Sequence, residues 1–166
     1  AAAAALFALA PKVLVLPTSS YLVVRALVDD HVRQGHMEAR FVDVADTSAV
    51  VAAIPGADVV WIETPTNPTL DVADVPAICA AAQAAGAKVV VDNTFLGPMF
   101  QHPLELGVDL LVYSATKYLA GFSDLLAGVA MSKNEELIAT LRGLRGVLGN
   151  ILQADECWLL SSRLAT

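Results

Sequence analysis

A lysine and two hydroxyl groups follow one apolar run of the chain, and a carboxylate ends another. Ser114, Thr116 and Lys117 come directly after LLVY, and Asp92 ends the run KVVVD. Hydroxyl groups donate hydrogen bonds to phosphate oxygens, and a partly desolvated lysine amine becomes a nucleophile toward aldehydes. Taken alone, residues 114–117 are also typical of a turn with a solvated lysine, and Asp92 of a helix cap or a metal ligand.

The combination of these groups indicates one kind of cofactor. Pyridoxal 5'-phosphate needs an amine for its aldehyde, a carboxylate at its pyridine nitrogen and hydrogen-bond donors for its phosphate. Lys117, Asp92 and the hydroxyls of Ser114 and Thr116 supply all three in one chain. The sequence therefore predicts pyridoxal 5'-phosphate as the cofactor.

Short β-branched runs alternate with helical patterns, which predicts an α/β fold with a mostly parallel sheet. We expect strands at residues 12–17, 39–44, 58–63, 88–92, 110–114 and 128–132. We expect helices at residues 20–34, 47–54, 74–85, 134–143 and 151–161. Asp74 is the expected N-cap of the third helix and Gly86 its stop. Ligands of such sheets bind beyond the carboxyl ends of the strands, where Asn67, Asp92 and Lys117 fall.

The composition and charge of the chain argue against several classes of binding partner. The chain has 166 residues, 56% of them hydrophobic, so we expect one domain with a large core or a subunit interface. A net charge of -7 argues against nucleic acid or an anionic membrane surface as a partner, and no apolar run is long enough to span a membrane. Cys79 and Cys157 lack metal-ligand and CxxC spacing, so we expect buried, reduced thiols in a cytoplasmic protein.

The histidines and tryptophans are expected to be structural. His31, His36 and His102 have no carboxylate or thiol at ligand spacing, so no metal site is predicted. Trp61 and Trp158 are expected in the core or at an interface.

Three segments resemble the marks of the Cys/Met-metabolism family of pyridoxal-phosphate enzymes. They read ETPTNP at 63–68, VVDNTF at 90–95 and SATKYLAGFSD at 114–124. That family includes cystathionine γ-synthase, cystathionine β- and γ-lyases and methionine γ-lyase. The resemblance implies the large domain of a fold-type I enzyme, a three-layer sandwich around a mostly parallel sheet. It implies that residues 1–166 form part of that cofactor-binding domain.

The resemblance implies roles for the residues named first. Lys117 matches the lysine that holds the cofactor and, once released, can act as general base at the substrate Cα. Asp92 matches the aspartate at the pyridine nitrogen. Ser114 and Thr116 match the residues that bind the phosphate.

Three further residues are assigned to the cofactor site by the same resemblance. Asn67 matches the asparagine near the phenolic oxygen of the cofactor, and Thr94 is included among the cofactor-binding residues. Tyr21 is a weaker match, because the usual Y-G-G pattern is missing. The family places a tyrosine there that stacks on the pyridine ring and acts as an acid or base. The alternative for Tyr21 is a tyrosine that only fills space.

The chain also departs from the family pattern. Phe122 stands where the family usually has histidine. The S-G-M phosphate loop, the phosphate-binding residues lent by a neighbouring subunit and the C-terminal domain that grips the substrate carboxylate are not visible. The chain is therefore interpreted as the middle of a longer enzyme.

The function implied by the resemblance is a carbon–sulfur lyase that acts on a sulfur amino acid by β- or γ-elimination, in a homodimer or homotetramer. A γ-replacement enzyme of the cystathionine γ-synthase type and a lyase domain within an assembly-line synthase are the alternatives among enzymes. Outside enzymes, the alternative is a non-catalytic scaffold fragment. Dinucleotide binding is disfavoured, because no G-x-G-x-x-G follows a strand.

Overall fold

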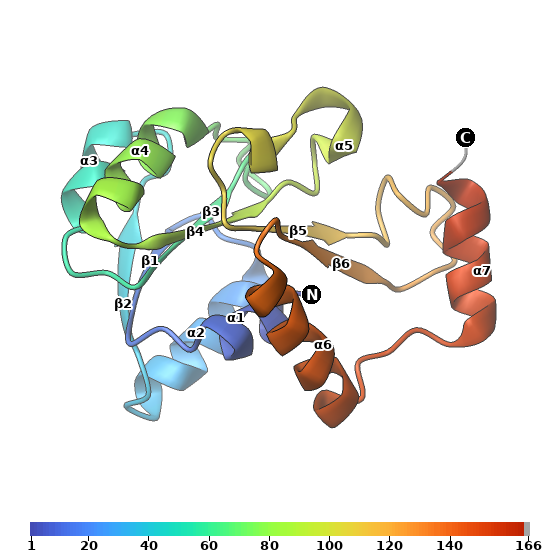
Figure 1. Ribbon diagram of the computed structural model, residues 1–166. Helices are drawn as coiled ribbons and strands as arrows, with labels where there is room; N and C mark the ends of the chain where they lie inside the picture. Colours follow the sequence, from blue (N-terminus) through green and yellow to red (C-terminus); the bar gives the residue numbers. More distant parts are fainter. Residues whose placement is uncertain (165–166) are drawn as a thin grey trace.

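The computed structural model describes residues 1–164 and shows a six-stranded sheet with helices on both faces (Figure 1). The strands lie side by side in the order β2-β1-β3-β4-β5-β6. They are β1 (Val13–Pro17), β2 (Glu38–Val42), β3 (Val59–Glu63), β4 (Lys88–Asp92), β5 (Leu110–Ser114) and β6 (Gly128–Met131). The first five are parallel, and β6 runs antiparallel to β5. The predicted α/β class with a mostly parallel sheet is confirmed.

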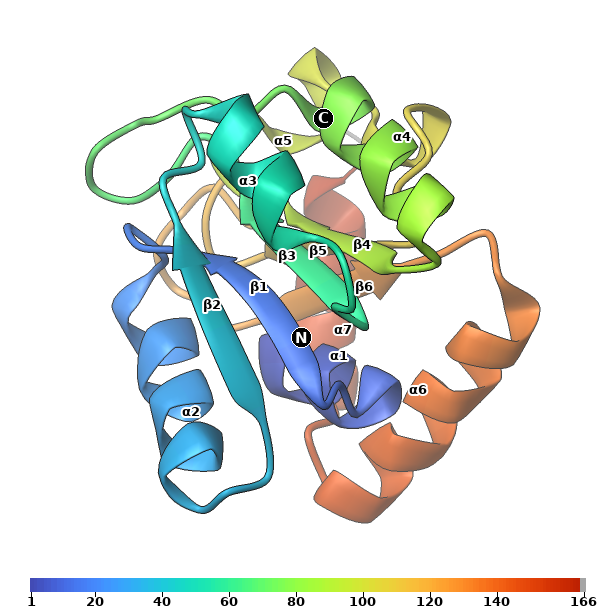
Figure 2. The same ribbon diagram turned by 90° about the vertical axis from the view of Figure 1, so that its left-hand side faces the viewer.

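The helices form the two outer layers, with α3 and α4 on one face of the sheet and α1, α2 and α6 on the other (Figure 2). The α-helices are α1 (Ala2–Leu9), α2 (Leu22–Arg33), α3 (Thr47–Ala53), α4 (Val75–Ala85), α5 (Gly97–Phe100), α6 (Glu135–Leu148) and α7 (Ala154–Arg163). A short 3-10 helix, η1 (Pro103–Glu105), follows α5. The sequence pattern predicts neither α5 nor η1, because both are shorter than two helical turns.

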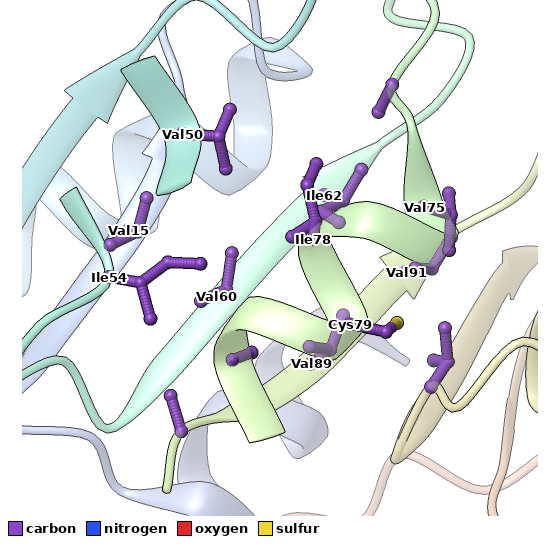
Figure 3. Packing of buried hydrophobic residues seen from close by; sticks show 14 of the residues in the cluster. Val15, Val50, Ile54, Val60, Ile62, Val75, Ile78, Cys79, Val89 and Val91 are labelled. Atoms are coloured by element: carbon purple, nitrogen blue, oxygen red, sulfur yellow. The ribbon is translucent and has the colours of Figure 1, made fainter. Parts of the chain in front are cut away.

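The parallel strands are apolar on both faces because helices cover both. Along β1, Leu14 and Leu16 pack with α1, α2 and α6, whereas Val15 between them packs with α3 and α4. Figure 3 shows the second group, in which Val60 and Ile78 meet between β3 and α4. This two-sided burial is the reason why these strands read as continuous apolar runs.

Local signals set the ends of α4 as predicted. The Asp74 side chain accepts a hydrogen bond from the Ala77 N–H at 3.1 Å, which satisfies a free donor of the first turn. Gly86 ends the helix with φ 76°, a left-handed conformation that glycine adopts without steric cost.

The predicted end of α6 at Gly143 is wrong. The helix continues to Leu148 and ends at Gly149, which has φ 70°. Gly143 and Gly146 lie within it, on the exposed side, while Leu137 and Leu141 are buried on the opposite side. The apolar repeat continues beyond the first glycine, and its burial outweighs the helix-breaking tendency of glycine.

The expected burial of Cys157 on α7 is also wrong. Cys157 is exposed, although Cys79 is buried as predicted, and Trp158 is 71% exposed, although Trp61 lies in the core. The helix contributes one buried side chain, Leu160, to a small cluster beside the β5–β6 connection. Its remaining faces are therefore open in this chain.

Within residues 1–164, no helix combines the length and the apolar character needed to cross a membrane.

Candidate active site

The carboxyl ends of β1, β3, β4 and β5 meet along one edge of the sheet, and two adjoining cavities open there. The smaller has a volume of about 70 Å³. It is lined by Tyr21, Glu63, Pro65, Asn67, Asp92, Thr94, Phe95, Ser114 and Lys117. The larger, of about 570 Å³, shares Tyr21, Asp92 and Ser114 with it and adds Thr116. All seven residues assigned to the site from the sequence thus lie around these two cavities.

A hydrogen-bonded chain connects the end of β4 to the end of β5. Asp92 Oδ1 accepts hydrogen bonds from the Thr94 N–H at 3.0 Å and from the Thr94 hydroxyl at 2.5 Å. The Thr94 hydroxyl oxygen accepts in turn from the Ser114 N–H at 2.8 Å. Burial raises the pKa of Asp92 above its usual value, and the two bonds from Thr94 oppose that rise.

The segment after β5 is held at Thr116. Its hydroxyl accepts from the Ala127 N–H at 3.0 Å, and its own N–H donates to the Ala127 carbonyl at 3.2 Å. The Lys117 N–H donates to the Ser114 carbonyl at 3.1 Å, which closes a tight turn. The side chain of Lys117 is exposed in this chain, so the expectation of a partly desolvated amine is not met here.

Tyr21 and Asn67 approach the cavities from neighbouring turns. Tyr21 is the N-cap residue of α2, and its ring is 46% exposed while lining both cavities. Asn67 is half-buried and lines the smaller cavity.

The sequence reasoning assigned no role to Glu63, the residue that ends β3. Its side chain is 5% exposed and accepts hydrogen bonds from the backbone N–H groups of Tyr21 and Asn67. Burial raises its pKa to about 7. The available signal was the same one that drew attention to Asp92, a carboxylate at the end of a buried strand.

The donor set at this edge suits pyridoxal phosphate. Asp92 offers a carboxylate for the pyridine nitrogen, Ser114 and Thr116 offer hydroxyls for a phosphate, and Lys117 offers an amine. Among the described residues 1–164, no three histidine, cysteine or acidic side chains gather as metal ligands. The arrangement is thus typical of an enzyme that works through an aldehyde cofactor and a lysine.

The comparison with known proteins gives the family. The model of the family described as "Cys/Met metabolism PLP-dependent enzyme" matches residues 1–166, and the chain belongs to that family. This confirms the resemblance seen in the three sequence motifs. Pyridoxal 5'-phosphate, the cofactor predicted from the sequence, is the cofactor of this family.

Individual relatives agree with the family. The chain is 43% identical over 131 residues to cystathionine beta-lyase MetC of Bacillus subtilis, covering 78% of this chain and 34% of that protein. The crystal structure of the cystathione gamma lyase CalE6 from Micromonospora echinospora matches with a TM-score of 0.90 and 39% identity, covering 98% of this chain and 44% of that one. The chain therefore spans less than half the length of these relatives.

A third relative was solved with small molecules bound. Cystathionine gamma synthase from Xanthomonas oryzae pv. oryzae, in complex with aminoacrylate and cysteine, matches with a TM-score of 0.91 and 32% identity, covering 98% of this chain and 43% of that one. Similar folds thus occur in relatives named as a beta-lyase, a gamma lyase and a gamma synthase.

Proposed function

We propose that the protein carrying this chain is a pyridoxal-phosphate-dependent carbon–sulfur lyase that acts on a sulfur amino acid, with residues 1–166 as the core of its cofactor-binding domain. One observation carries the proposal: Lys117, Asp92, Ser114 and Asn67 line one cavity at the carboxyl edge of the sheet. Membership of the family and the lyase names of its relatives support the choice of reaction.

Each side chain has a distinct task in this proposal. When bound, the cofactor supplies a protonated ring that withdraws electrons from the substrate Cα. Asp92 holds the proton on the pyridine nitrogen, because a carboxylate favours a neighbouring cation. Ser114 and Thr116 hold the phosphate through their hydroxyls. Lys117 would hold the cofactor through its amine and, once the substrate amine has replaced it there, would accept the Cα proton as a general base.

Two residues from the neighbouring turns complete the proposed site. The Asn67 amide would donate a hydrogen bond to the phenolic oxygen of the cofactor. The Tyr21 ring would cover the pyridine ring, and its phenol would serve as an acid or base. The reaction would break the bond between sulfur and the β or γ carbon and release a sulfur species.

A γ-replacement reaction is the second candidate. It is supported by the likeness to a cystathionine gamma synthase whose structure holds aminoacrylate and cysteine. The two candidates are distinguished by supplying an activated homoserine ester together with cysteine and testing whether cystathionine forms.

We further propose that the protein is cytoplasmic and forms a homodimer or homotetramer. Several large apolar residues are exposed to solvent in this chain, among them Leu126 at 82%, Val147 at 84% and Trp158 at 71%. A partner subunit that covered such side chains would remove their apolar surface from water. Analytical ultracentrifugation of the whole protein measures its oligomeric state. A monomer at micromolar concentration would contradict the proposed homodimer or homotetramer.

The central experiment locates the cofactor lysine. Adding pyridoxal phosphate to the whole protein should produce a visible absorption band, and borohydride followed by peptide mapping should place the pyridoxyl group on Lys117. Lys117→Ala should abolish the band and the release of thiol from an S-substituted cysteine or homocysteine. Lys133→Ala, at another exposed lysine, is the matched control and should change neither. A label on a different lysine, or turnover by Lys117→Ala, would show the assignment to be wrong.

A further inference from the structure

The Glu63 carboxylate lies between the two turns that carry Tyr21 and Asn67. Its Oε2 accepts a hydrogen bond from the Tyr21 N–H at 2.6 Å, and its Oε1 accepts from the Asn67 N–H at 2.9 Å. Each oxygen therefore holds a different turn. One turn begins α2 and the other follows β3, so a single side chain at the end of β3 holds a turn whose Tyr21 lies 42 residues earlier in the chain.

Burial makes these two bonds important. Glu63 is 5% exposed, so water has little access to replace a lost partner. A buried acceptor that loses its donor bears the full cost of leaving water. A second link between the same turns runs from the Ser19 hydroxyl to Asp71 Oδ2, but at 3.4 Å it is long and weak. Beyond the pairing of β1 with β3, which ends before the turns, the position of Tyr21 relative to Asn67 therefore depends mainly on Glu63.

The groups that face Glu63 come from the neighbouring strand ends. Asp92 is the residue of β4 that pairs with Glu63 of β3. Tyr21 and Lys117 line the same cavity as Glu63. The charge of Asp92 and the burial both favour the protonated form of Glu63, whereas the two backbone N–H groups favour the carboxylate. Burial and the Asp92 charge together outweigh the two N–H groups. The pKa of Glu63 therefore rises to about 7, within the pH range in which enzymes work.

We propose that Glu63 is a positioning residue whose carboxylate holds the Tyr21 and Asn67 turns together at the cofactor cavity. The inference rests on the proposed function only where cofactor affinity is concerned. A carboxylate can accept from both N–H groups, whereas a protonated acid or an amide presents only one good acceptor oxygen. Loss of the negative charge should therefore loosen one or both turns and weaken cofactor binding without removing any group that touches the cofactor.

The test compares Glu63→Gln with a matched control at the opposite edge of the sheet. Asp58 Oδ2 accepts from the Lys12 and Val13 N–H groups at 2.7 and 2.8 Å, so Asp58→Asn makes the same chemical change to a carboxylate that also bridges two backbone donors. Hydrogen–deuterium exchange of the whole protein reports on the Tyr21 and Asn67 amides. Titration with pyridoxal phosphate, followed by absorbance from pH 5.5 to pH 8, reports the dissociation constant.

In Glu63→Gln, exchange at the Tyr21 and Asn67 amides should be faster by about tenfold, the usual consequence of losing a hydrogen bond to a charged acceptor. The dissociation constant at pH 8 should rise by a similar factor. The ratio of the mutant constant to the wild-type constant should fall toward one at pH 5.5, where wild-type Glu63 is itself protonated. Asp58→Asn should change neither the exchange at these amides nor that ratio.

Three outcomes would overturn the inference. The first is unchanged exchange at the Tyr21 and Asn67 amides in Glu63→Gln. The second is a ratio of dissociation constants that does not vary with pH, because a purely structural effect of Glu63 is present at every pH. The third is the same ratio in Asp58→Asn. If Glu63→Gln does not fold, exchange at the two amides in the wild-type protein, corrected for intrinsic rates, should still lose protection below pH 7, and constant protection would count against the inference.

Failure of the proposed function gives a different result. If the wild-type protein binds no pyridoxal phosphate at any pH, the proposed function fails. The exchange rates at Tyr21 and Asn67 then decide the role of Glu63 without reference to the cofactor.

Discussion

Asp92 and Thr94 are joined twice, because one carboxylate oxygen accepts from both the N–H and the hydroxyl of the same threonine, at 3.0 and 2.5 Å. The threonine hydroxyl also accepts from the Ser114 N–H. Thr94 therefore favours the ionised form of a largely buried carboxylate and sets its position relative to the end of β5.

Replacing Thr94 by valine keeps the shape of the side chain but removes the hydroxyl. We expect Thr94→Val to raise the dissociation constant of pyridoxal phosphate by about ten- to a hundredfold, since a hydrogen bond to a charged group contributes about 1.5–3 kcal/mol. Thr94→Ser retains the hydroxyl and should bind nearly as the wild-type protein does. Absorbance titration of the three proteins measures the effect, and equal affinity for the valine and serine variants would contradict it.

The raised pKa of Glu63 predicts how stability changes with pH. Its pKa rises from 4.5 in a model carboxyl to about 7 in the folded chain. Between these values the folded state binds more protons than the unfolded state, so the contribution of Glu63 to stability falls as the pH rises. It is fully present below about pH 4.5 and lost above about pH 7, with a slope below about 1.4 kcal/mol per pH unit. This sign belongs to global unfolding, which brings Glu63 into water. Loosening of the two turns within the folded chain leaves Glu63 buried and removes only the Tyr21 and Asn67 N–H bonds, which lower its pKa, so that local step is favoured by protonation.

Urea unfolding of the wild-type protein and Glu63→Gln between pH 4.5 and pH 8 checks this expectation. The difference between the two free energies of unfolding isolates Glu63 from Asp92, whose raised pKa acts in the same direction. A difference that increases in favour of the wild-type protein as the pH rises would show the sign to be wrong.

Arg163 links α7 to the segment that follows Lys117. Its guanidinium donates two hydrogen bonds to Asp124, both at 2.6 Å, and lies 4.8 Å from the centre of the Phe122 ring. The hydrogen bonds from Arg163 hold the pKa of Asp124 below its usual value of 3.8. Because the folded pKa is lowered, the stabilisation is present above about pH 3.8 and is lost as the pH falls through the lower folded value.

Asp124→Asn should therefore increase hydrogen exchange in residues 117–127 at pH 7. At a pH low enough to protonate Asp124 in the folded chain, the variant and the wild-type protein should exchange alike. The effect should also shrink in high salt, because the pair is exposed. Equal exchange at pH 7 would show that the pair does not hold this segment.

Two glycines of α6 should respond to alanine in opposite directions. Gly143 lies inside the helix, and a Cβ there would meet no atom within 4 Å, so Gly143→Ala should raise the free energy of unfolding by about 0.5–1 kcal/mol. Gly149 ends the helix with φ 70°, so Gly149→Ala should lower it by about 1 kcal/mol or more. Urea unfolding measures both, and changes of the same sign would contradict the assigned helix end.

The strands and the site edge could be predicted from the sequence because two simple rules apply. Strands covered by helices on both faces are continuously apolar, and the polar residue that ends each run must lie at the carboxyl edge of a parallel sheet. Asp92 after KVVV and Ser114 after LLVY satisfy both rules, so their meeting around one cavity follows from the fold class.

The remaining features depend on contacts that residue spacing does not encode. The role of Glu63 appears only when Tyr21, 42 residues earlier in the chain, is brought to it. The exposure of Cys157 and Trp158 depends on which face of α7 packs, and only Leu160 does so. The end of α6 at Leu148 differs from the predicted end at Gly143 because glycine is a weak stop signal where the apolar repeat continues on the buried side.

The three hydrogen bonds between Thr116 and Ala127 have a consequence for how the chain can vary. They close residues 117–126 into a loop whose two ends meet at one point. Lys117 is attached directly to that junction, whereas Phe122 lies near the far tip. Because the junction bears the geometry, a different residue at position 122 can be accommodated without displacing the lysine. The departure from the family pattern at Phe122 is thereby separated from the chemistry at the base of the loop.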